Sequence, residues 1–176
     1  MPDGVMSLPR EGERIVGGGL DATIKVTTEF PSMLSSFEIA VPPGYDVGAH
    51  RHELGEENFF IVEGELEMFC FEPVDRSNPD WHEWRSQDGR GPMRGGPGTF
   101  MFVPEGTPHA FANPTDQPAR MFFQSSVPGG HENYFYELAD LLNASDGKPD
   151  PADSEALRKR WHIEQLTPIG VARSTS

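Results

Sequence analysis

Short apolar segments separated by turns fill the chain up to about residue 127. The segments are rich in β-branched and aromatic residues, and Gly, Pro, Asn or Asp lie between them, which is the pattern of short strands. Strands are predicted at residues 23–28, 35–41, 50–52, 59–62, 65–71, 99–103, 109–113 and 119–126. Many short strands with turns between them predict an all-β fold, an antiparallel sandwich or a jelly-roll barrel.

The pattern changes to that of helices after the last predicted strand. In 133–142 the apolar residues recur at the spacing of one helix face, so this helix is expected to pack against the strands. A second helix is predicted over 151–161. Asp150 is its N-cap, Pro151 takes the first helical position, and basic residues fill the last turn, where cations interact favourably with the helix dipole. The final residues, 171–176, are expected to have no regular structure.

The length of the chain and the lack of an internal repeat indicate one domain. A chain of 176 residues is long enough to bury a core around a small cavity. The patterns divide it into an N-terminal segment (1–22), a barrel (23–127) that includes an insertion (72–97), and a C-terminal helical extension (128–176).

The insertion is rich in Gly, Pro, Asp and Arg and contains Trp81 and Trp84. A connection this long in a compact domain is often a lid or a binding loop, although an exposed or dimer-contacting insertion fits the pattern equally well. Trp81 and Trp84 would then either cover a flat aromatic substrate or pack on a partner subunit.

The acidic composition argues against nucleic-acid and membrane partners. Lys and Arg total 14 against 28 Asp and Glu, and a formal charge of −14 opposes binding to phosphate backbones and anionic lipids. Residues 1–14 lack the apolar core of a signal peptide, and no apolar run has the length of a membrane span, so a cytoplasmic location is expected. The one cysteine, Cys70, lies in an apolar strand and is expected to be a core residue.

Three histidines and a glutamate stand where turns meet predicted strands. His50 and His52 alternate along an extended segment, so both imidazoles leave the same face. Glu57 follows Gly55, where the chain can turn, and His109 follows a rigid Pro- and Gly-containing turn. Each histidine taken alone is more simply a surface or core residue, but the four residues together predict one metal site.

The donor set indicates which metals fit. Imidazole nitrogens with one carboxylate suit Fe(II), Mn(II), Co(II) or Ni(II) and leave room for water or substrate. A closed structural zinc site is disfavoured, because such sites usually contain thiolates and this chain has a single cysteine.

Two motifs around these residues resemble the signatures of the cupin superfamily. The first consists of Gly44, His50, His52, Glu57 and Gly64, and the second of Gly98, Pro104, Gly106, His109 and Asn113. The resemblance implies a cupin jelly-roll β-barrel, or double-stranded β-helix, that holds one divalent transition metal per chain through His50, His52, Glu57 and His109.

More specifically, the chain resembles single-domain cupins of the quercetin dioxygenase type. This implies that O2 oxidises or cleaves an electron-rich enol or aromatic small molecule at the metal, with Glu57 also accepting the proton of the substrate hydroxyl. The pocket walls are then expected to contain Phe59, Ile61, Phe100, Phe102, Phe111 and Phe123, with His131 and Tyr134 in the roof. An exposed position for His131 at the start of a helix, after a turn at Gly129 and Gly130, fits the sequence equally well. On base rates each phenylalanine is simply core.

Other functions are compatible with the same fold, because one fold hosts many chemistries. A non-redox cyclase or isomerase would use the metal as a Lewis acid on a polyketide-like intermediate. A small-molecule-binding cupin would perform no turnover. A homodimer is the expected assembly, because two-fold symmetry is common and many cupins pair through N-terminal strands and sheet edges, for which residues 23–28 are the candidate here.

Overall fold

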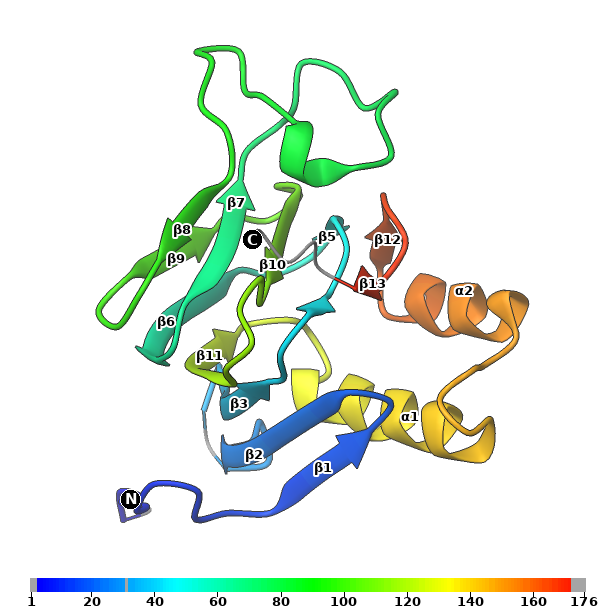
Figure 1. Ribbon diagram of the computed structural model, residues 1–176. Coiled ribbons are helices and arrows are strands. Elements are labelled where there is room, and N and C mark those ends of the chain that lie inside the picture. The colour runs from blue at the N-terminus through cyan, green and yellow to red at the C-terminus, as the bar shows by residue number, and fades with distance from the viewer. Residues whose placement is uncertain (1–2, 31, 172–176) are drawn as a thin grey trace.

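Two antiparallel sheets form the body of the molecule (Figure 1), a computed structural model that describes residues 3–30 and 32–171. The six-stranded sheet has the order β1-β2-β3-β11-β6-β9. Its strands are β1 (Arg14–Gly17), β2 (Leu20–Val26), β3 (Ser35–Val41), β6 (Glu57–Glu63), β9 (Phe100–Val103) and β11 (Ala119–Ser125).

The second sheet has seven strands, five of them in the order β12-β5-β10-β4-β13, while β7 pairs with β10 and β8. They are β4 (Tyr45–Asp46), β5 (His50–His52), β7 (Leu66–Cys70), β8 (Met93–Gly95), β10 (His109–Ala112), β12 (Ile163–Gln165) and β13 (Gly170–Val171). From β3 to β11 the chain passes repeatedly from one sheet to the other, as in a jelly roll.

Two helices follow β11 and lie beside the sheets, and the chain then returns to the second sheet as β12 and β13 (Figure 1). They are α1 (His131–Ala144) and α2 (Pro151–Arg160); α1 contacts β1, and α2 contacts β12 and α1. Asp150 caps α2 by accepting a hydrogen bond from the Ala152 amide at 2.8 Å. The predicted all-β fold with C-terminal helices is therefore confirmed. Of the tail expected to lack structure, Val171 ends β13 and 172–176 lie outside the described residues.

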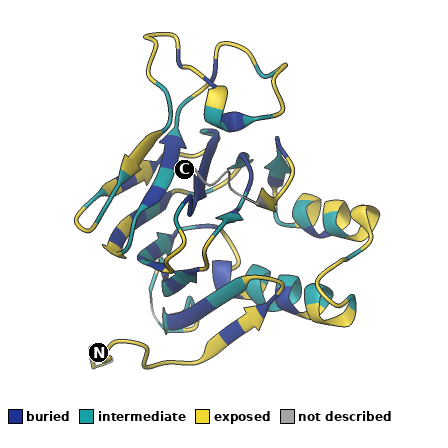
Figure 2. Ribbon diagram, viewed as in Figure 1, coloured by how far each residue is buried: buried dark blue, intermediate teal, exposed yellow. Residues whose placement is uncertain are grey.

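The core fills the space between the sheets, where Figure 2 shows buried residues on most strands. In β9 the buried residues are Met101 and Val103, whereas Phe100 and Phe102 are 60% and 43% exposed on the outer face. Ile61 is completely buried in the core cluster.

The insertion packs down onto the second sheet. Both of its tryptophans are buried beside Phe69, and the Trp81 indole N–H donates to Asp46 Oδ1 at 3.0 Å. The Trp84 indole N–H donates to the Asn78 carbonyl at 2.8 Å. Trp81 and Trp84 were expected to cover a substrate or a partner subunit; instead they anchor the insertion to its own barrel.

His82 adds an ionic contact to this anchor. Its Nε2 lies 3.3 Å from Asp46 Oδ2 and its Nδ1 lies 3.2 Å from Glu67 Oε2. Burial works against the charged ring, but the two carboxylates outweigh it and raise the pKa of His82 to about 9. The imidazolium is thus a link between the insertion and strands β4 and β7.

The strand at 23–28, proposed as a dimer edge, is not at an edge. It corresponds to β2, which is hydrogen-bonded to β1 on one side and to β3 on the other. Residues 20–23 of β2 pair with β1 and residues 22–26 pair with β3, and the outer strands of this sheet are β1 and β9. Among the described residues, no helix combines the length and the apolar character that crossing a bilayer requires.

Candidate metal centre

The four predicted ligands come together on three strands of the two sheets. His50 and His52 lie on β5, Glu57 begins β6, and His109 begins β10, directly opposite His50 in the antiparallel register. One donor atom of each residue lies within 4.8 Å of the donor atoms of all the others. Gly55, with φ of 86°, makes the turn between β5 and β6 that brings Glu57 back toward the histidines.

The carboxylate of Glu57 lies between two of the imidazoles. Its Oε1 is 3.3 Å from His52 Nε2, and its Oε2 is 2.8 Å from His109 Nε2. Two donors that each lie about 2.1 Å from one ion, at a right angle, are about 3.0 Å apart. The observed separations match those of atoms that share an ion.

Backbone carbonyls orient two of the histidines. His50 Nδ1 lies 2.9 Å from the Gly48 carbonyl, and His109 Nδ1 lies 3.0 Å from the Thr107 carbonyl. A carbonyl only accepts, so each Nδ1 donates its proton and each Nε2 keeps a free lone pair. This is the arrangement that metal-ligating histidines usually have.

The electrostatics of the cluster favour a cation. Burial lowers the pKa of His50 well below its usual range and that of His52 to about 4, so both rings are neutral ligands at neutral pH. Burial would raise the pKa of Glu57, but His52 and His109 counteract it and hold that pKa below its usual range. The result is a buried, ionised carboxylate beside the neutral rings of His50 and His52.

The same cluster contains buried polar atoms that protein groups do not satisfy. Glu57 Oε2, His109 Nε2 and His52 Nδ1 have no hydrogen bond of ordinary geometry, although the first two are 2.8 Å apart. Such atoms are rare in folded proteins unless a water or an ion binds them. Charge, spacing and donor type thus all fit a divalent metal.

A fourth histidine lies against the cluster from α1. His131 is buried, and its Nδ1 is 3.0 Å from Ser125 Oγ and 3.7 Å from Glu57 Oε1. The start of α1 is fixed by Glu132, whose carboxylate accepts hydrogen bonds from the Thr28 amide and hydroxyl and from the Ser35 hydroxyl. His131 is therefore held in place beside the predicted ligands.

A cavity of about 360 Å³ opens beside the centre. Besides His50, His52 and Glu57, its lining contains five of the predicted pocket residues, namely Phe59, Phe111, Phe123, His131 and Tyr134. The other three do not line it. Phe100 and Phe102 point outward from β9, because the inward positions of that strand are Met101 and Val103, and Ile61 lies in the core.

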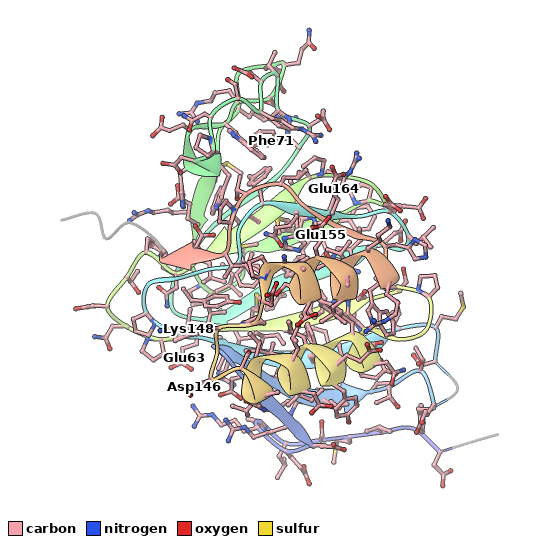
Figure 3. The ribbon with its side chains drawn as sticks, turned by 90° about the vertical axis from the view of Figure 1, so that its right-hand side faces the viewer. Glu63, Phe71, Asp146, Lys148, Glu155 and Glu164 are labelled. Carbon is pink, nitrogen blue, oxygen red and sulfur yellow. The ribbon has the colours of Figure 1, made fainter. Side chains whose placement is uncertain are left out.

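Residues of both helices also line the cavity, and most of them were not predicted from the sequence. Figure 3 shows α1 and α2 lying side by side across the sheets. Tyr45 on β4, Leu138 on α1 and Arg158 on α2 line the cavity with them. The basic last turn of α2 predicts the end of the helix, and the spacing of Ser154 and Arg158, four residues apart, is the sequence signal that puts both on the helix face toward the cavity.

Comparison with known proteins gives a family and several partial structural matches. A family model described as a cupin domain matches residues 37–124. No curated protein matches the chain. Oxalate decarboxylase from Bacillus subtilis is 22% identical with a TM-score of 0.49, and the match covers 65% of this chain and 27% of the decarboxylase.

Two further solved structures match part of the chain. A sugar phosphate isomerase of the cupin superfamily from Silicibacter pomeroyi is 21% identical with a TM-score of 0.48, covering 65% of this chain and 71% of that one. DMSP lyase from Ruegeria pomeroyi is 28% identical with a TM-score of 0.38, covering 52% and 37%. The chain thus spans about a quarter of the decarboxylase and just over a third of the lyase.

Proposed function

The chain belongs to the cupin family, whose model matches residues 37–124, and on that premise we propose that it is a mononuclear metal-dependent dioxygenase. Its substrate would be an electron-rich enol or aromatic small molecule, as in quercetin dioxygenase-like cupins. The observation that carries this proposal is the buried Glu57 carboxylate, whose donor atoms lie among those of three histidines beside a cavity that several aromatic residues line.

His50, His52, Glu57 and His109 would hold one Fe(II), Ni(II), Co(II) or Mn(II) ion. When bound, such an ion supplies Lewis acidity, which lowers the pKa of a coordinated enol or phenol hydroxyl and favours the electron-rich anion that reacts with O2.

The protein's own groups would prepare the substrate for this reaction. Glu57 Oε1, which faces His52 and His131, is the atom that would accept the proton of the substrate hydroxyl. Phe59, Phe111 and Phe123 would exclude water from the cavity and favour a flat ligand.

The helical extension would belong to the same functional unit. Residues of α1 and α2 line the cavity together with strand residues, so we propose that the barrel at 23–127 needs the extension at 128–176 to form a closed site. We also expect a homodimer, for which the outer strands of the six-stranded sheet, β1 and β9, are candidate edges. The molar mass in solution tests the assembly.

Elemental analysis of the purified protein tests the metal. The His50→Ala, His52→Ala double variant is the control for adventitious metal, and circular dichroism checks that it is folded. Near-stoichiometric iron, nickel, cobalt or manganese in the wild type alone is the expected result.

Oxygen-uptake assays on flavonols and related enols would then test the reaction. Zinc in the wild type, with turnover that needs no O2, would instead identify a non-redox cyclase or isomerase acting on a polyketide-like intermediate. No metal even after reconstitution would contradict both activities and leave a small-molecule-binding barrel.

A further inference from the structure

The helical wall of the cavity contains a positive charge that has no acidic partner. Arg158 and Ser154 lie four residues apart on α2 and both line the cavity. Arg158 is half-buried, and none of the ion pairs within the described part of the chain includes its guanidinium. Arg160 on the same helix, in contrast, pairs with Glu137 at the surface. The two arginines thus differ in surroundings although both belong to the last turn.

Tyr134 connects Arg158 to the candidate metal centre. Its hydroxyl is within hydrogen-bonding reach of the Arg158 guanidinium. The charge of Arg158 lowers the pKa of this hydroxyl, and the charge of Glu57 raises it. Burial raises the pKa of Tyr134 and raises that of Tyr45, another lining residue, to about 12. Both phenols are therefore neutral hydrogen-bond donors, and the cavity has a second polar region besides its metal ligands.

The side chains of Arg158 and Tyr134 favour the binding of an anion in this part of the cavity. A guanidinium that faces an apolar cavity without a counter-charge is costly, and a ligand carboxylate would satisfy it with two parallel hydrogen bonds. Among the lining residues Arg158 is the one permanent cation, so a singly charged carboxylate is matched, whereas a phosphate dianion would leave one charge uncompensated. The chain as a whole carries a charge of −14, so this attraction is local to the cavity.

We propose that Arg158, together with the Tyr134 hydroxyl, binds a carboxylate group of the substrate. The substrate is accordingly an enolic or phenolic carboxylic acid. The position of its hydroxyl at the His/Glu centre rests on the proposed function, but the carboxylate site does not, because it uses a different set of residues.

Two probes that differ only in a carboxylate test the site: 3,4-dihydroxybenzoate and catechol. Each is titrated calorimetrically, without O2, into the Ni(II)-reconstituted protein. We expect the wild type to bind the acid more tightly than catechol. Arg158→Gln should weaken binding of the acid roughly 10- to 100-fold, the range of a charge-assisted hydrogen-bond pair, and leave catechol binding unchanged.

Two further variants guard against a general structural effect. Arg160→Gln removes a neighbouring arginine of the same turn and should bind both probes as the wild type does. Arg158→Lys keeps the charge but loses the planar fork, so its preference for the acid should be intermediate. Lack of preference in the wild type, or a preference that Arg158→Gln retains, would overturn the site.

The same titrations in the His50→Ala, His52→Ala variant separate this proposal from the proposed function. A preference for the acid that persists there and depends on Arg158 supports the carboxylate site even if the metal proposal fails. A preference that survives Arg158→Gln but disappears in the double variant would place the carboxylate at the His/Glu centre and refute the inference.

Discussion

Replacing His82 with Gln should remove most of the pH dependence of stability between pH 6.5 and 9. The His82 ring lies between Asp46 and Glu67 and stacks on the Trp81 indole, with ring centroids 3.8 Å apart. Its pKa is about 9 in the folded protein, against an ordinary value of 6.5. Because the folded-state pKa is the higher one, the stabilisation is complete below pH 6.5 and is lost as the pH rises through 9.

The magnitude follows from the two pKa values. Each pH unit between them is worth about 1.36 kcal/mol, so the charged His82 contributes about 3 kcal/mol at low pH. The His82 side chain is only 16% exposed, and for this reason solvent screening removes little of that free energy. The contribution is a large fraction of the stability of an ordinary domain.

Urea unfolding at several pH values measures this contribution. The difference in the free energy of unfolding between wild type and His82→Gln should shrink by about 3 kcal/mol from about pH 6 to about pH 9.5. His162→Gln is a matched control, because His162 is 55% exposed beside Glu53 and should leave the wild-type curve intact. Parallel curves for wild type and His82→Gln would refute the reasoning.

Two other predictions concern the signature motifs. Glu57→Gln should retain the metal in elemental analysis and lose turnover, because the amide cannot accept the substrate proton; joint loss of metal and activity would show that Glu57 serves only as a ligand. Gly64→Ala should lower the free energy of unfolding by at least about 1 kcal/mol more than Gly98→Ala. Both glycines have positive φ, but a Cβ at Gly64 would meet Ala119 Cα at 2.7 Å, whereas a Cβ at Gly98 meets nothing within 4 Å. Equal losses in urea unfolding would contradict this account.

Local signals in the sequence predicted several elements closely. Asp150 and Pro151 fixed the start of α2, since an N-cap and a proline at the first helical position act within a few residues. The spacing of His50 and His52 likewise predicted two imidazoles on one face of a strand, and the family that the two motifs indicated is confirmed by the cupin domain match.

The errors arose where the local pattern leaves the direction of a side chain open. Residues 100–103 are all apolar, so alternation cannot say which pair faces inward, and packing between the sheets selected Met101 and Val103. The surroundings of Trp81 depend on Asp46, 35 residues earlier in the chain. The pattern of residues within the insertion cannot predict a contact with a residue so far away in the sequence.

The strand that holds two of the candidate ligands also raises a question of timing during synthesis. His50 and His52 lie on β5, whose partners are His109 on one side and β12 (Ile163–Gln165) on the other. Arg51 and Glu164, which pair across β5 and β12, are 113 residues apart in the chain. At ordinary rates of translation those residues leave the ribosome on the order of ten seconds apart. Until residue 165 has emerged, the backbone groups of β5 that face β12 stay unpaired, whereas the last of the four candidate ligands, His109, emerges earlier.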